Sequence, residues 1–126
     1  MKAPACNLVG LEQRFSPTAT SCDVVMANMT LFRGPSMDVG IAYEIGYADA
    51  LGLAVFAYSS NQTAYASRVP QPARHCIDTD GWTVEDFGLT DNLMMVGAAS
   101  LAPDRPVYPT WRDAVLAIEN WPPRLP

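Results

Sequence analysis

Two short apolar runs in the first half of the chain flank a stretch with helical character. Residues 23–27 (DVVMA) and 53–58 (LAVFAY) are apolar without alternation, which is typical of parallel strands that are covered on both faces. Between them, residues 38–51 predict a helix, with Asp38 able to cap its start and Gly52 placed to end it in the left-handed conformation. This order predicts two parallel strands joined by a right-handed crossover.

The second half of the chain gives weaker signals. Residues 59–80 are rich in Ser, Gln, Pro and Arg and predict a surface excursion. Residues 83–95 predict a short helix, because Thr83 and Asp86 have the spacing of a capping box with Asp in place of Glu. After a short strand at 107–108, the same spacing recurs at 110–113, ahead of an apolar helical stripe that Trp121-Pro122-Pro123 ends; the stripe consists of Trp111, Ala114, Val115 and Ile118.

Together these elements predict an α/β fold, a three-layer flavodoxin-like or Rossmann-like domain with a parallel sheet. A length of 126 residues suits a single domain, 1–126. Residues 1–22 are atypical because they show neither helical nor strand periodicity, so we expect the amino-terminal edge of the sheet to be incomplete.

Composition excludes several functional classes. The formal net charge of -5 disfavours binding to a nucleic-acid polymer. We expect no contact with a membrane and a cytoplasmic location, since no apolar run approaches the ~20 residues of a membrane span and the start of the chain lacks the core of a signal peptide. The three cysteines, Cys6, Cys22 and Cys76, have no zinc-ligand spacing with the single His75, so they predict reduced thiols and no metal site.

Glu44 is the most informative candidate for chemistry. Its helical neighbours three and four residues away are Gly40, Ile41, Tyr47 and Ala48, so no Lys or Arg can pair with it along the helix. One interpretation is a solvated glutamate on the outer face of the helix. The other is a carboxylate in a cleft that the small residues clear, which would suit a nucleophile or an acid.

Asp38 and Asn92 have ordinary structural interpretations as well. Asp38 precedes Glu44 by six residues, about 240° around an ideal helix, so the two converge only if Asp38 belongs to the incoming loop. Alone, Asp38 suits a helix cap and Asn92 a cap or a turn. His75, in the irregular excursion, suits a solvated loop residue better than a base.

A resemblance to a known family rests on several of these segments. Residues 23–28 (DVVMAN), 32–34 (FRG), 38–48 (DVGIAYEIGYA), 87–89 (FGL) and 92–94 (NLM) resemble the nucleoside 2-deoxyribosyltransferases, over about 22–98. The resemblance implies that Glu44 is the nucleophile and that Asp38 assists it by holding the sugar. It further implies that Asn92 holds the sugar 5′-hydroxyl and that Met94, Gly40 and Phe32 line the substrate site.

The implied reaction is transfer of 2-deoxyribose between the nucleobases of deoxynucleosides through a covalent glutamyl sugar, within nucleotide salvage. Neither metal nor organic cofactor is implied, and the substrates are small deoxynucleosides and free nucleobases. The resemblance also implies a homo-oligomer, in which the Asn-Leu-Met segment reaches the site of a neighbouring subunit.

The amino-terminal residues depart from the family. Residues 1–21 contain no Ala-Gly-Pro turn, and Phe15 stands eight residues before Asp23, where the family carries Asp or Asn. Two alternatives therefore stay open. One is a deoxynucleoside 5′-monophosphate N-hydrolase, although those enzymes place Ser where Asp38 stands. The other is a non-catalytic nucleoside-binding or interaction protein derived from the enzyme.

Overall fold

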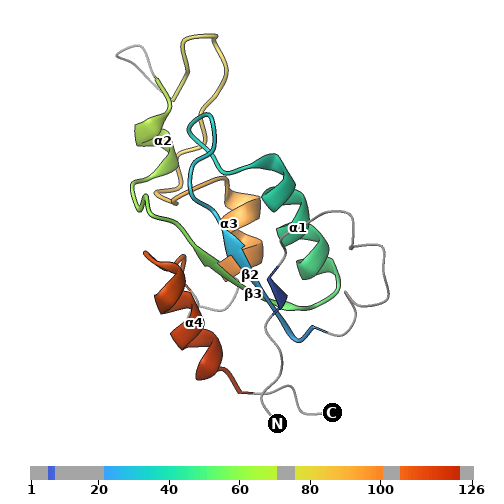
Figure 1. Ribbon diagram of the computed structural model, residues 1–126. Helices are drawn as coiled ribbons and strands as arrows, with labels where there is room; N and C mark the ends of the chain where they lie inside the picture. Colours follow the sequence, from blue (N-terminus) through green and yellow to red (C-terminus); the bar gives the residue numbers. More distant parts are fainter. Residues whose placement is uncertain (1–5, 8–21, 71–75, 101–105, 123–126) are drawn as a thin grey trace.

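A three-stranded parallel sheet lies at the centre of the computed structural model, which describes residues 6–7, 22–70, 76–100 and 106–122 (Figure 1). The strands are β1 (Cys6–Asn7), β2 (Val24–Asn28) and β3 (Ala54–Tyr58), in the order β1-β2-β3. Beyond β3, Tyr58 forms a single parallel bridge with Tyr108. The predicted last strand is therefore reduced to one bridge at the edge of the sheet.

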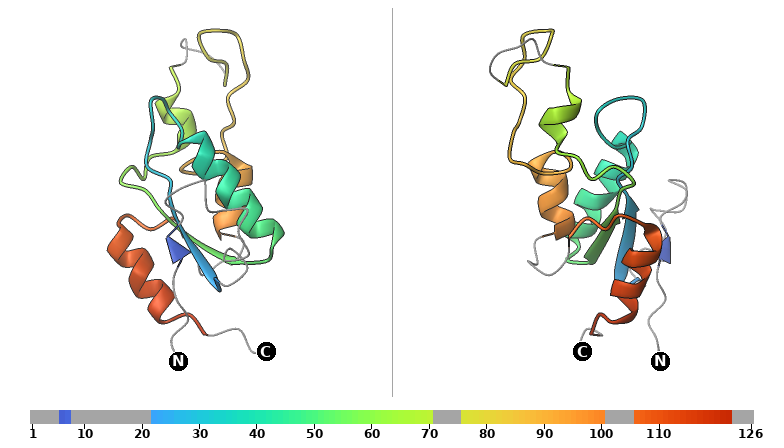
Figure 2. Two further views of the ribbon diagram at one scale, coloured as in Figure 1. Left: turned by 45° about the vertical axis from the view of Figure 1, so that its right-hand side comes forward. Right: turned by 90° about the vertical axis from the view of Figure 1, so that its left-hand side faces the viewer.

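Helices cover both faces of this sheet (Figures 1 and 2). Helices α1 (Val39–Ala50) and α3 (Leu93–Ser100) pack against each other and against the strands, while α4 (Trp111–Glu119) packs against β2 and β3 on the other side. The short helix α2 (Tyr65–Arg68) stands beyond the carboxyl end of β3. The fold is a three-layer α/β domain, as the hydrophobic pattern predicts.

The core shows why the two apolar runs lack alternation. Alternate strand residues point toward α1 and α3 and are buried there with residues of both helices: Val25, Ala27, Val55 and Ala57 from the sheet, Ile45 and Ala48 from α1, and Val96 and Ala99 from α3. Between them in sequence, Phe56 points the opposite way and meets Trp121 edge to face, with ring centroids 5.4 Å apart. Both faces of β3 are covered, so both sets of positions are apolar.

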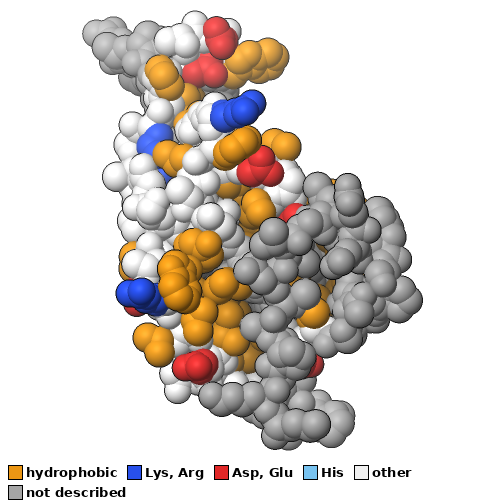
Figure 3. Space-filling view, in the orientation of Figure 1, with side chains coloured by type: hydrophobic (Ala, Val, Ile, Leu, Met, Phe, Trp, Pro, Cys, Tyr) orange, Lys and Arg blue, Asp and Glu red, His pale blue; other side chains and the backbone are white. Residues whose placement is uncertain are grey.

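Two helices have the predicted ends. Asp38 is the N-cap of α1, and Gly52 adopts the left-handed conformation after it, with φ +67°. Thr110 is the N-cap of α4, where its hydroxyl accepts from the Asp113 N–H. In α4 only part of the predicted stripe is covered, because Ala114 is buried whereas Trp111 is 51% exposed. Apolar side chains are correspondingly visible at the surface over α4 (Figure 3).

The predicted helix start at Thr83 is wrong. Thr83 forms an antiparallel bridge with Ile77, and the Val84 N–H donates to the Cys76 carbonyl at 2.6 Å. Gly88 then adopts a left-handed φ of +69°, and the helix begins only at Leu93. The backbone at Thr83 is thus engaged in a bridge between two extended segments and cannot begin a helical turn.

The amino-terminal edge carries a strand that the sequence analysis does not predict. Cys6 and Asn7 pair in parallel with Val25 and Met26 of β2. This strand is two residues long. The departures from the family at 8–21, with Phe15, and the loop residue His75 lie outside the described residues. Cys76 is an exposed free thiol.

Candidate active site

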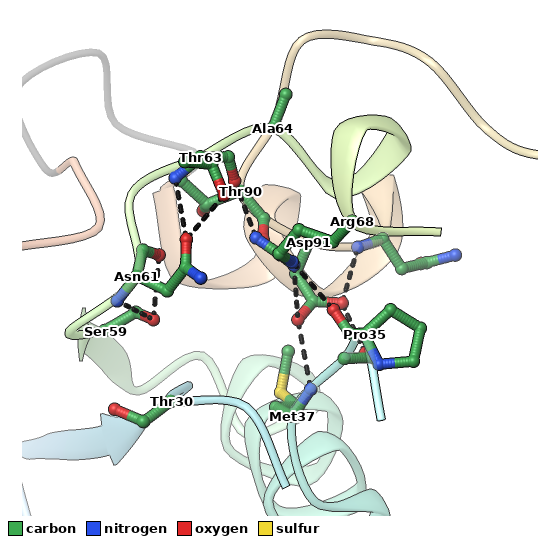
Figure 4. A network of polar contacts seen from close by, with 12 residues as sticks. Thr30, Pro35, Met37, Ser59, Asn61, Thr63, Ala64, Arg68, Thr90 and Asp91 are labelled. Carbon is green, nitrogen blue, oxygen red and sulfur yellow. Dashed lines mark hydrogen bonds and ion pairs between the residues drawn. The ribbon is translucent and has the colours of Figure 1, made fainter. Parts of the chain in front are cut away.

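Three loops meet at the carboxyl ends of β2 and β3, next to the start of α1 (Figures 1 and 4). Residues 29–37 connect β2 to α1, residues 59–64 connect β3 to α2, and residues 76–92 lead into α3. The first two are joined at their bases, since Met29 N–H donates to the Tyr58 carbonyl at 2.7 Å. In open α/β sheets this edge is where ligands bind.

Asp38 occupies the end of the first loop. Its backbone is extended, with φ -62° and ψ 135°, and its Oδ1 accepts the Gly40 N–H at 2.8 Å. Within the described part of the chain, Oδ2 makes no hydrogen bond. The capping interpretation is therefore confirmed for one carboxylate oxygen, while the other remains able to accept a hydrogen bond from a ligand.

Gly40 is small because Asp38 is close. A Cβ built at Gly40 would stand 2.8 Å from Asp38 Oδ1, well inside van der Waals contact. At Gly46, on the same helix, a Cβ would meet nothing within 4 Å. The absence of a side chain at Gly40 thus has a steric explanation in the capping carboxylate of Asp38, and its absence at Gly46 has none.

Glu44 lies in the second turn of α1 and is 6% exposed, beside the buried Ile45. The interpretation of Glu44 as a solvated residue on the outer face of the helix is therefore wrong. Placing a carboxylate among apolar side chains costs free energy unless polar groups or charges compensate it. A buried acid near the ligand-binding edge of the sheet is a candidate for covalent or acid chemistry.

Asn92 and Met94 stand at the start of α3. The Asn92 Oδ1 accepts the Met94 N–H at 2.9 Å, and its Nδ2 donates to Glu85 Oε2 at 2.9 Å. The side chain of Asn92 thus caps α3, as its structural interpretation expects. The Met94 side chain is 73% exposed.

Phe32 projects from the first loop. It is 51% exposed, and the Arg33 guanidinium lies 5.2 Å from the centroid of its ring. The structure thus gathers Phe32, Asp38, Gly40, Glu44, Asn92 and Met94 on the β2–α1 loop, on α1 and at the start of α3, the helix packed against α1.

The residues that join these loops are not among the candidates that the sequence indicates. Arg68, at the end of α2, donates to the carbonyls of Pro35, Thr63 and Thr90 at 2.9, 2.6 and 2.6 Å, and its Nη2 lies 3.8 Å from Asp91 Oδ2 (Figure 4). The available signals were weak. Arg68 is the single charged residue in 59–70, and Asp91 directly precedes the Asn-Leu-Met segment.

The described residues include no group of three or more His, Cys, Asp or Glu side chains arranged to hold a metal ion. In the same part of the chain, none of the helices is long and apolar enough to cross a membrane.

Comparison with known proteins assigns the chain to a family. The family model described as nucleoside 2-deoxyribosyltransferase matches residues 18–94, a range that includes Asp38, Glu44, Asn92 and Met94. The chain belongs to the nucleoside 2-deoxyribosyltransferase family. The predicted family is thereby confirmed.

A solved structure similar to this deoxyribosyltransferase-family chain agrees with the assignment. It is a 2-desoxiribosyltransferase from Leishmania mexicana, with 30% sequence identity and a TM-score of 0.63. The similarity covers 79% of this chain and 59% of the Leishmania chain. The comparison with curated protein sequences gives no match.

Proposed function

We propose that this family member transfers 2-deoxyribose between nucleobases, with Glu44 as the nucleophile. The observation that supports this most is the burial of the Glu44 carboxylate on α1, the helix that Asp38 caps, at the ligand-binding edge of the sheet. A carboxylate oxygen attacks C1′ and forms an ester while the bond from C1′ to the base nitrogen breaks. The departing base keeps that electron pair and takes a proton from solvent. A nitrogen of a second base then attacks C1′, the bond from C1′ to the carboxylate breaks, and the second base releases its N–H proton to solvent.

The sugar 5′-hydroxyl is held by Asp38 and Asn92 in this proposal. Asp38 Oδ2 accepts a hydrogen bond from the hydroxyl, while Oδ1 keeps its hydrogen bond from the Gly40 N–H. The Asn92 amide exchanges its exposed bond to Glu85 for the sugar. A 5′-phosphate in the same place would face the Asp38 charge, and two unit charges ~4 Å apart at an effective dielectric of 20 repel by about 4 kcal/mol. The substrate is therefore an unphosphorylated deoxynucleoside.

Incubation of the purified chain with deoxyinosine and adenine tests this function. The wild type should form deoxyadenosine. Glu44→Gln should fold and lose the activity, since an amide is a poor nucleophile. Asp49→Asn, which neutralises an exposed carboxylate on the same helix, is the matched control and should keep full activity. Mass spectrometry of quenched enzyme should find the sugar on Glu44, and an adduct on Asp38 instead would contradict the assignment.

The same assay separates the alternative functions. Faster cleavage of deoxyinosine monophosphate than of deoxyinosine would favour the N-hydrolase. Saturable binding of deoxyinosine with neither cleavage nor exchange would favour a non-catalytic nucleoside-binding protein.

We also infer that the active form is a homo-oligomer. Leu93 and Met94 are 43% and 73% exposed, so the segment that the family resemblance directs to a neighbouring subunit is free to contact a second copy of this chain. The sedimentation coefficient and the specific activity, measured across one dilution series, should fall together, as mass action requires. A monomer with full activity would overturn this inference.

A further inference from the structure

A buried guanidinium and a buried carboxylate join the three loops at the candidate active site. Arg68 binds carbonyls in all three: Pro35 before α1, Thr63 after β3 and Thr90 before α3. Asp91 Oδ2 lies 3.8 Å from Arg68 Nη2, beyond a hydrogen bond but close enough for charge pairing. We refer to this pair, with the loop groups that it binds, as the Arg68–Asp91 clip (Figure 4).

The two charged side chains of the clip are buried. The side chains of Arg68 and Asp91 are 8% and 1% exposed. Among the described residues, Asp91 and Glu44 are the two buried side chains that carry a carboxylate. A buried ion pair adds little net stability, because desolvation of the two charges offsets their attraction. The charge-assisted hydrogen bonds that Arg68 donates to carbonyls and that Asp91 accepts from loop donors fix where these loop groups lie.

Asp91 binds Asn92, which is assigned to the sugar, and the residues that immediately precede Asp38, the other residue assigned to the sugar. Its Oδ2 accepts the N–H of Met37, the residue before Asp38, at 3.1 Å. Its Oδ1 accepts the Ser36 hydroxyl at 2.5 Å and the N–H of Asn92 at 2.8 Å. A single carboxylate therefore fixes the last residues of the loop before α1 and the residue that caps α3.

We propose that Asp91 is a positioning residue, which sets the separation between Asp38 and Asn92 so that both reach the same sugar hydroxyl. Arg68 holds Asp91 in place and ties the loop after β3 to the pair. This inference rests on the proposed function, since it concerns how the 5′-hydroxyl of the substrate is recognised. Neither residue touches the substrate in it; both act through Asp38 and Asn92.

The test compares deoxyinosine with 2′,5′-dideoxyinosine, which lacks the 5′-hydroxyl, in the transfer assay with adenine. The wild type should prefer deoxyinosine in kcat/KM by about 10-fold or more, as expected when a hydrogen bond to a charged group is lost. In Asp91→Asn, one oxygen becomes an NH₂ group that cannot accept from Met37 or Ser36. The preference should fall to within about 3-fold, mainly through slower turnover of deoxyinosine.

Further variants separate positioning from folding. Ser36→Ala removes one bond to Asp91, keeps the ion pair and should reduce the preference partway. Arg68→Lys keeps the charge but lacks the planar group that reaches three carbonyls, so this variant should also have a reduced preference for deoxyinosine. Ser67→Ala is the matched control: its exposed hydroxyl bonds only to the Ala64 carbonyl within the described chain, and the preference should stay at the wild-type value.

The outcomes are distinct. A loss of activity that is equal for both substrates in Asp91→Asn and Ser36→Ala would overturn the inference and leave the proposed function standing, since it would mean that the clip only supports the fold. A wild type with no transfer to adenine from deoxyinosine would overturn the proposed function, and the inference with it. An equal rate for the two substrates in the wild type would overturn the assignment of the 5′-hydroxyl to Asp38 and Asn92, and hence this role for Asp91.

Discussion

A capping carboxylate leaves little room for the residue two positions on, and Gly40 occupies that position after Asp38. In Gly40→Ala, the new Cβ would stand 2.8 Å from Asp38 Oδ1, so the Asp38 side chain must turn away. We expect deoxyribosyl transfer to fall about 10-fold or more, because the carboxylate that holds the sugar is displaced. The free energy of unfolding should change little, since the higher helix propensity of alanine, about 1 kcal/mol, offsets most of the stability that is lost with the Asp38 cap.

The control for this substitution is Gly46→Ala. A Cβ at Gly46 meets nothing within 4 Å, so the same gain in helix propensity, about 1 kcal/mol, should appear as higher stability with unchanged activity. Urea unfolding followed by circular dichroism, alongside the transfer assay, measures both. Equal activity in the two variants would show that the placement of Asp38 does not matter for the reaction.

At this scale the sequence predicts the residues that stand in a local motif. Asp38, Gly40 and Glu44 lie within seven positions of one another. The lack of a helical ion-pair partner singles out Glu44, and the resemblance implies a role for each of the three. Asp91 and Arg68 act through partners far away in the chain: the Ser36 hydroxyl that binds Asp91 is 55 residues distant. No pattern of spacing along the chain indicates such a contact, so these residues emerge only from the folded arrangement.

Among the elements, α4 depends on its cap for a defined start. Thr110 accepts from the Asp113 N–H at 3.3 Å and donates its hydroxyl to Asp113 Oδ2 at 2.6 Å. Thr110→Ala should therefore lower the free energy of unfolding by about 1 kcal/mol. Thr110→Ser, which keeps the hydroxyl, should restore most of it. The urea midpoint of the two variants is the measurement, and identical midpoints would show that the cap contributes nothing.

The elements differ in how well their sequences predict them. The strands β2 and β3 and the helices α1 and α4 are predicted because each has a continuous apolar run or a cap beside a helical stripe. The start of α3 is mispredicted, since capping-box spacing at Thr83 also suits an extended segment that pairs with Ile77. A strand of two residues, β1, is too short to show any periodicity.

At the scale of the whole molecule, the order of strands and helices along the chain predicts the three layers. The candidate site depends in addition on how the loops at one edge of the sheet contact one another. Parallel pairing of β2 and β3 through α1 brings both strands' carboxyl ends to one edge. Every described residue of the candidate site lies at this edge or on α1, which starts there. The chain spans 59% of the length of the Leishmania mexicana chain to which it is similar.

The Arg68–Asp91 clip also has a consequence for local unfolding. The amide protons of Met37 and Asn92 are both bound by the Asp91 carboxylate, although they belong to different loops. Loops open at lower free energy than core strands, so these two amides should exchange with solvent faster than those of β2 and β3. They should exchange at matched rates, because one event, release of the carboxylate, exposes both.

Hydrogen exchange followed by NMR can test this coupling. In Asp91→Ala, which removes the acceptor of both amides, protection of Met37 and Asn92 should fall together while the strand amides keep theirs, when exchange is measured under conditions far from global unfolding. Unrelated rates at the two amides would show that the loops open independently. If the rates match, the two loops form a single cooperative unit, so any ligand that orders one of them also protects the other.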